Sequence, residues 1–195
     1  GNMRNAFKYI LTGYLLIFLN IHLIIDILPD PIGYFMILLG TRKIELNESG
    51  MHPSRIVATL LLFLSMPTVL INPQFFQNQV PEWWGMYTTA MSVLDLILVY
   101  FLFQLIKRVV ELLNSLELTT KTENTYKGYM VVMLIILFIQ PFLTHLSEHT
   151  ANGFTIFLVL AGFITQIIFL VFLRTLQKQF PYNSSDTGEF LNLKV

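Results

Sequence analysis

The chain has 195 residues, of which 54% are hydrophobic and 12% are charged, and it contains no cysteine. In a soluble domain about a quarter of the residues are charged, so this composition indicates an integral membrane protein. The 12 Lys and Arg residues balance 12 Asp and Glu residues, so no excess positive charge is present to hold the phosphates of a nucleic acid. The lack of cysteine excludes disulfide scaffolds, thiol redox chemistry and cysteine-bound zinc.

Six apolar stretches follow one another, and a membrane-spanning helix needs about 20 mostly apolar residues. They are Phe7 to Leu28, Ile32 to Leu39, Ile56 to Ile71, Trp84 to Ile106, Tyr129 to Leu146 and Phe154 to Leu173. The second is short even if its helix continues to Leu46, and it can cross if the bilayer thins or if Arg42 and Lys43 extend to the interface. The sequence therefore predicts an all-α bundle of six transmembrane helices over residues 1–180, followed by a polar cytoplasmic tail at 181–195.

The charge pattern predicts the orientation, because Lys and Arg collect in the cytoplasmic loops of membrane proteins. With six crossings and the N-terminus inside, all 12 basic residues lie inside. If the short second stretch returned to its own side, basic and acidic residues would mix on both faces. The pattern favours a cell-membrane protein with both termini in the cytoplasm, in contact with membrane lipids.

Asp95 is the strongest candidate for a functional residue, because an ionisable side chain inside a membrane is costly and often marks a site. It lies near the middle of the fourth stretch, and Thr88 and Ser92 share its helical face. Such a carboxylate suits a proton carrier or a cation ligand. The alternative is a packing role, in which Asp95 accepts a hydrogen bond from a neighbouring Thr, Gln or Tyr.

A second group of polar residues closes the first hairpin. His22 and Asp26 are four residues apart and share a helical face. Asp30 precedes Pro31 and has a structural explanation as the N-cap of the second helix, while Asp26 either faces a cavity or reaches the outer interface. Together with Asp95, these residues predict an outward-facing acidic cavity for a cation, a proton or a cationic solute.

The segment from Ile25 to Gly40, IDILPDPIGYFMILLG, resembles a known hairpin motif. The pattern I-D-x-x-P-D-x-I-G-Y links the first two helices in small uncharacterised polytopic membrane proteins of Gram-positive bacteria. The resemblance implies a helical hairpin in a bacterial membrane protein and implies no activity.

A third polar group lies at the outer end of the fifth stretch. The string HLSEH, which contains His145, Glu148 and His149, matches H-x-x-E-H, a pattern in which two His residues on one helix bind zinc and Glu acts as a base. The alternatives are a bound metal cation without catalysis and polar residues that simply face the membrane interface.

Smaller signals concern packing and partners. Gln166 is interpreted as a helix-packing residue, with a role in ligand binding as the alternative, and Gly33 and Gly40 as positions where helices approach closely. Tyr129 is expected to mark an inner membrane interface. The segment from Lys107 to Leu118 has apolar residues at a roughly helical spacing, so its apolar side packs on a neighbouring helix, the membrane surface or a partner protein.

These patterns lead to three hypotheses of function. The first is a transporter, or a membrane subunit that binds a solute or cation in the acidic cavity. The second is a non-catalytic partner or sensor subunit of a membrane complex. The third, ranked last, is a metal-dependent intramembrane enzyme that uses His145, Glu148 and His149.

Overall fold

The computed structural model describes residues 2–22, 30–44, 50–67 and 81–180. The described residues form six α-helices and one 3-10 helix. These are α1 (Asn2–His22), α2 (Asp30–Lys43), α3 (Pro53–Leu64), α5 (Glu82–Leu112), α6 (Leu116–Ile139), η2 (Gln140–His145) and α7 (Glu148–Gln179). The all-α class predicted from the sequence is confirmed. Asp26 and the predicted tail at 181–195 lie outside the described residues.

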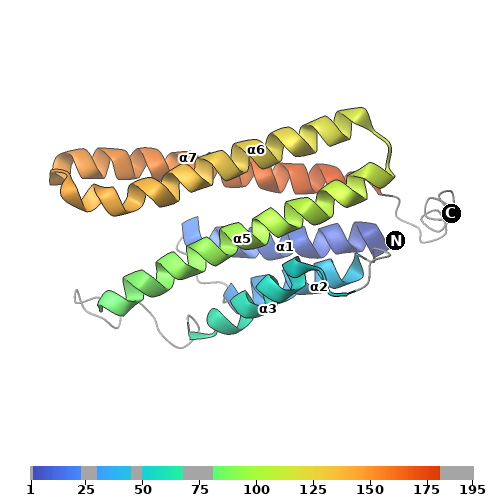
Figure 1. Ribbon diagram of the computed structural model, residues 1–195, viewed down its shortest axis with the longest axis horizontal. Coiled ribbons are helices and arrows are strands. Elements are labelled where there is room, and N and C mark those ends of the chain that lie inside the picture. Colours follow the sequence, from blue (N-terminus) through green and yellow to red (C-terminus); the bar gives the residue numbers. More distant parts are fainter. Residues whose placement is uncertain (1, 23–29, 45–49, 68–80, 181–195) are drawn as a thin grey trace.

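The helices run alternately in opposite directions along the long axis of the molecule (Figure 1). α1 begins and α7 ends at the same end, where Arg4 donates a hydrogen bond to the carbonyl of Phe180 at 3.3 Å. The rings of Phe7 and Phe180 stack there with their centroids 5.4 Å apart. We call this the basic end, and the opposite end, where α5 begins at Glu82 and α7 at Glu148, the acidic end.

Three helical segments are long and apolar enough to cross a membrane. They are α5, the continuous run of α6 and η2 from Leu116 to His145, and α7, with 31, 30 and 32 residues. α3 is a shorter apolar helix of 12 residues. Length and composition thus support a membrane protein.

Several helix boundaries differ from those predicted. α6 begins at Leu116, well before Tyr129, because the side chain of Ser115 accepts a hydrogen bond from the backbone N–H of Leu118 and so caps the helix. Just before it, Asn114 adopts a φ of 52°, a conformation that Asn tolerates and that ends α5. α3 stops at Leu64, short of the predicted Ile71, because a residue that precedes a proline, here Pro67, disfavours helical geometry.

α1 and α2 touch backbone to backbone through glycines. A Cβ atom added at Gly13 would lie 2.5 Å from the carbonyl oxygen of Gly33, and one at Gly40 would lie 2.7 Å from the carbonyl oxygen of Ala6. These distances are shorter than any normal contact. The close approach predicted at Gly33 and Gly40 is therefore confirmed, and Gly13 is their counterpart on α1.

Buried side chains concentrate toward the basic end of the bundle. From Leu96 to Val110, α5 is mostly buried, and α7 contributes Phe169, Phe172, Leu173 and Leu176 to the same core. Toward the acidic end the apolar side chains are exposed instead, with Met86 at 76%, Phe138 at 71% and Phe157 at 67%. Such exposed apolar surface is typical of helices that face lipid.

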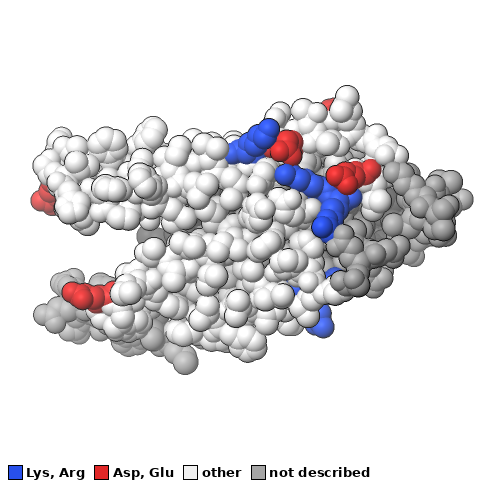
Figure 2. Space-filling view, viewed as in Figure 1, with Lys and Arg blue, Asp and Glu red and all other residues white. Residues whose placement is uncertain are grey.

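The space-filling view shows the consequence of this uneven packing. The molecule is closed at the basic end and notched at the acidic end, between the α6–α7 hairpin and the arm that contains α5 (Figure 2). The notch is confined to the acidic end, and the rest of the described bundle is closed on this face (Figure 2).

The glycine contact leads to a stability prediction. Gly13→Ala places a methyl group against the backbone of α2, which cannot move aside as a side chain can, so we expect a loss of about 1–3 kcal/mol, typical of overpacking. The matched control is Gly85→Ala, because nothing lies within 4 Å of a Cβ atom at Gly85. Thermal unfolding in detergent measures both variants, and equal unfolding temperatures for the two would contradict the glycine contact.

Candidate functional site

Asp95 lies near the middle of α5, where the exposed part of the helix gives way to the buried part. On α5, the exposed Ser92 and Val93 precede it and the buried Leu96 follows it, and Asp95 itself is partly buried. The hydroxyl group of Tyr34, on α2, donates a hydrogen bond to the Oδ1 atom of Asp95 at 3.4 Å. The carboxylate therefore points toward α2, at the position on α5 where exposed residues give way to buried ones.

Two further tyrosines surround this carboxylate. Tyr14 on α1 and Tyr129 on α6 are buried, and the charge of Asp95 lies close enough to act on both hydroxyl groups. Tyr129 accepts a hydrogen bond from the Nε2 atom of Gln166, on α7, at 2.9 Å. Five helices thus each contribute one polar side chain, and we call these five residues the Asp95 cluster.

Aromatic rings pack against Tyr14 and Tyr129 on the side that faces the basic end. The ring of Phe169 lies 5.2 Å from that of Tyr14 and 5.1 Å from that of Tyr129. Phe103 packs on both Phe169 and Tyr129, at 5.3 Å and 6.1 Å between centroids. These phenylalanine side chains are almost fully buried, so the core is closely packed on the side of the cluster that faces the basic end.

The tyrosines are the part of the cluster that sequence reasoning missed. Tyr129 was expected at an inner membrane interface, but the structure buries it in the bundle and pairs it with Gln166. A signal for the other two was present, because Tyr14 directly follows Gly13 and Tyr34 directly follows Gly33. Where two helices approach closely at a glycine, the positions next to it lie near the contact and are candidates for burial.

Ser92 lies on the face of α5 that leads from Asp95 toward the acidic end. Its hydroxyl group donates to the carbonyl of Thr88 at 3.0 Å, and Thr88 in turn donates to Gly85 at 3.1 Å. Both hydroxyl protons are thus satisfied by their own helix, while their oxygens remain able to accept. Ser92 is exposed, so it does not belong to the buried cluster.

Of the three predicted residues in the first hairpin, the structure describes only the backbone of His22 and Asp30 and does not describe Asp26. α1 extends to His22, and α2 begins at Asp30, where the sequence predicted the start of a helix. The side chains of His22 and Asp30, and the whole of Asp26, lie outside the described residues. Their membership of the acidic cavity stays a prediction.

The HLSEH string does not form one helix. His145 ends η2, Leu146 and Ser147 break the chain direction, and Glu148 and His149 begin α7. The zinc pattern requires both His residues on one helix, which this break prevents. In the described part of the chain, no group of three His, Asp or Glu side chains lies close enough together to hold a metal ion.

The segment from Lys107 to Leu118 largely packs within the molecule. Val109, Val110 and Leu118 are buried, and Leu116 is the apolar side chain that stands out, at 83% exposed. Lys107 pairs with Glu123 on α6 at 3.2 Å and lies over the ring of Tyr126 at 3.9 Å. Its main contact is therefore the neighbouring helix, which was one of the three predicted alternatives.

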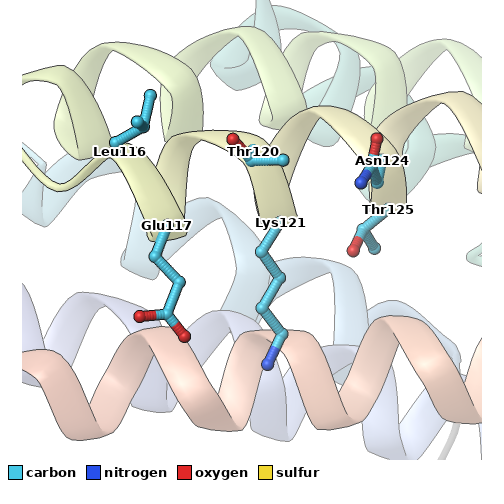
Figure 3. Close-up of a pocket in the computed structure, with 6 residues that line it drawn as sticks. All are labelled: Leu116, Glu117, Thr120, Lys121, Asn124 and Thr125. Carbon is cyan, nitrogen blue, oxygen red and sulfur yellow. The ribbon is translucent and has the colours of Figure 1, made fainter.

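A shallow depression lies on the surface of α6 near the basic end, apart from the Asp95 cluster. Figure 3 shows that Glu117 and Lys121 extend to the same side of the helix while Leu116 extends to the other. The lining residues are Leu116, Glu117, Thr120, Lys121, Asn124 and Thr125. Because Glu117 and Lys121 have opposite charges one helical turn apart, the depression has no single sign of charge to attract an ion.

The pairing of Gln166 with Tyr129 leads to a second prediction. Gln166→Leu leaves the buried Tyr129 hydroxyl without its donor, so we expect a loss of about 1–3 kcal/mol in the free energy of unfolding. Adding Tyr129→Phe removes the stranded hydroxyl, and the double variant is expected to recover most of the loss. Thermal unfolding of both single variants and the double variant measures the coupling, and purely additive losses would count against the hydrogen bond.

No protein-family model matches this chain, and no curated protein and no solved structure is significantly similar to it.

Proposed function

We propose that the protein is a six-span protein of the cell membrane, with both termini in the cytoplasm, that binds a proton, a cation or a cationic solute from outside. It acts as a small transporter or as the solute-binding subunit of one. In this proposal the basic end is cytoplasmic, the acidic end is external, and the notch is the entrance to the binding site.

The position of Asp95 carries the proposal. Its carboxylate lies at the position on α5 where exposed residues give way to buried ones, and tyrosines from three other helices lie close to it. The hydrogen bond from Tyr34 is the contact that a packing role requires, and Tyr14 and Tyr129 bring two more hydroxyl groups near the carboxylate than that role needs. A carboxylate within an apolar helix, with several hydroxyl groups near it, has the arrangement of a ligand site in a membrane bundle.

The distribution of charge adds support. On the face shown in Figure 2, Lys and Arg gather in the half that contains the basic end, and acidic side chains stand at the tips of the two arms. The described acids that begin the arms are Glu82 on α5 and Glu148 on α7. A mouth with negative charge raises the local concentration of cations and repels anions.

The topology is tested by labelling single cysteines, which is direct because the chain contains none. Asn152→Cys, at the start of α7, is expected to react with a membrane-impermeant maleimide in intact cells. Thr120→Cys, on α6 near the basic end, is expected to react only after the cells are permeabilised. Both positions are exposed, so the comparison depends on sidedness alone. The opposite pattern would invert the proposed orientation, and equal labelling in intact cells would exclude it.

Binding is tested with Asp95→Asn, which keeps the shape of the side chain and removes its charge. We expect acidification or at least one cation among Li⁺, Na⁺, K⁺, NH₄⁺ and choline to raise the unfolding temperature of the purified wild type by several degrees. A ligand at 100 times its Kd stabilises by about 2.7 kcal/mol, which is large enough to measure. The variant is expected to lose this response.

The matched control is Glu117→Gln, which removes an exposed carboxylate at the basic end. It is expected to respond as the wild type does. If wild type, Asp95→Asn and Glu117→Gln respond identically to every cation and to pH, Asp95 has a packing role, and the partner or sensor hypothesis takes precedence.

A further inference from the structure

The Asp95 cluster contains one buried polar atom that the fold leaves unsatisfied. The hydroxyl group of Tyr14 is buried and has no hydrogen-bond partner among the described residues, although the side chain is only 3% exposed. Burying a hydroxyl group without a partner is costly, so such a group in a native protein calls for an explanation. The polar groups near enough to act on this hydroxyl are Asp95, Tyr129 and Tyr34.

The contact between Tyr34 and Asp95 is also unusual. Its O···O distance of 3.4 Å is much longer than the usual O–H···O hydrogen bond of about 2.7–2.8 Å. A cation that binds oxygen at about 2.4 Å, the distance typical of Ca²⁺, separates two adjacent ligands by about 3.4 Å. Na⁺ has nearly the same radius as Ca²⁺. The two oxygens are thus spaced as neighbouring ligands of an ion of that size.

The number of charges selects between these two ions. Across the described residues, Asp95 is the one carboxylate away from the ends of the bundle, and the other oxygens of the cluster belong to neutral hydroxyl and amide groups. One carboxylate neutralises one positive charge. A divalent ion would carry a second, uncompensated charge into the bundle, which is strongly unfavourable in a membrane.

The packing limits the size of the ligand. The side chains of Tyr14, Tyr34 and Tyr129 are at most 4% exposed, and the rings of Phe103 and Phe169 close the side toward the basic end. A quaternary ammonium group would need these rings to move apart. A bare inorganic ion is far smaller and requires a smaller displacement of these side chains.

We propose that the cluster binds a monovalent inorganic cation of about the size of Na⁺, held by the carboxylate of Asp95 and by the hydroxyl oxygens of Tyr14 and Tyr34. This inference rests on the proposed function, because it names the ligand of the same site. In the ion-bound state the hydroxyl oxygen of Tyr14 gains the partner that the fold by itself does not supply.

The test uses the purified full-length protein and NaCl as the probe, with N-methylglucamine chloride to keep the ionic strength constant. The unfolding temperature is measured against Na⁺ concentration for the wild type and Tyr14→Phe, which removes one oxygen and keeps the ring. We expect Tyr14→Phe to need at least tenfold more Na⁺ for the same shift. Without Na⁺ its unfolding temperature is expected to equal or exceed that of the wild type, because a buried unsatisfied hydroxyl is gone.

Two further variants make the result specific. Tyr34→Phe removes the second hydroxyl ligand and is expected to weaken Na⁺ binding in the same way, which also covers the case in which Tyr14→Phe fails to fold. Tyr100→Phe is the matched control, because Tyr100 lies on α5 with Asp95 but is 39% exposed and lies outside the cluster. It is expected to follow the wild type.

The outcomes separate this inference from the proposed function. If Asp95→Asn abolishes the Na⁺ response while both Tyr→Phe variants keep it, the site binds a cation but the hydroxyl groups are not ligands, and the inference is wrong. If acidification stabilises the wild type and Na⁺ does not, the site holds a proton. A shift with choline and none with Na⁺ assigns the site to an organic cation. Each of the last two results overturns the inference and leaves the proposed function standing.

Discussion

The contact between Gly13 and Gly33 determines the geometry of the candidate site. Because neither residue has a side chain, the backbones of α1 and α2 come into direct contact, and any Cβ atom would force them apart. The next residue on each helix is a tyrosine, so this contact also fixes where Tyr14 and Tyr34 stand relative to each other. The contact of Gly40 with Ala6 and the hydrogen bonds from Arg55 to the carbonyls of Thr41 and Ile44 hold the other end of α2.

Packing and polarity change together along the bundle. Toward the basic end, the helices are held together by a buried apolar core and by polar contacts. These contacts include the ion pair of Lys107 with Glu123 and the hydrogen bond from Arg4 to the carbonyl of Phe180. Toward the acidic end, α6 and α7 expose apolar side chains on most of their surface. Exposed apolar surface of this kind carries no hydrophobic cost in lipid, which agrees with three helices that are long and apolar enough to cross a membrane.

Much of this arrangement was predictable, and what escaped prediction has identifiable physical causes. Asp95 and Gln166 were found from the sequence because polar residues inside apolar stretches are rare. Tyr14, Tyr34 and Tyr129 escaped because tyrosine is ordinary in membrane helices and is expected at the interface. The start of α6 was missed because its first turns are polar, so hydropathy does not mark them as helical. The cap at Ser115 is a single local hydrogen bond, which hydropathy also does not detect.

The sequence by itself determined the helical class, the presence of helices apolar enough to cross a membrane, and the position of Asp95 within one of them. These follow from composition and from the spacing of residues along a single helix, which are local properties. Only the tertiary structure decided that Asp95 meets hydroxyl groups from other helices, and that the two His residues of HLSEH lie on separate helical segments. Contacts between helices depend on how each one is rotated against its neighbours, and backbone contacts such as that of Gly13 with Gly33 set this rotation.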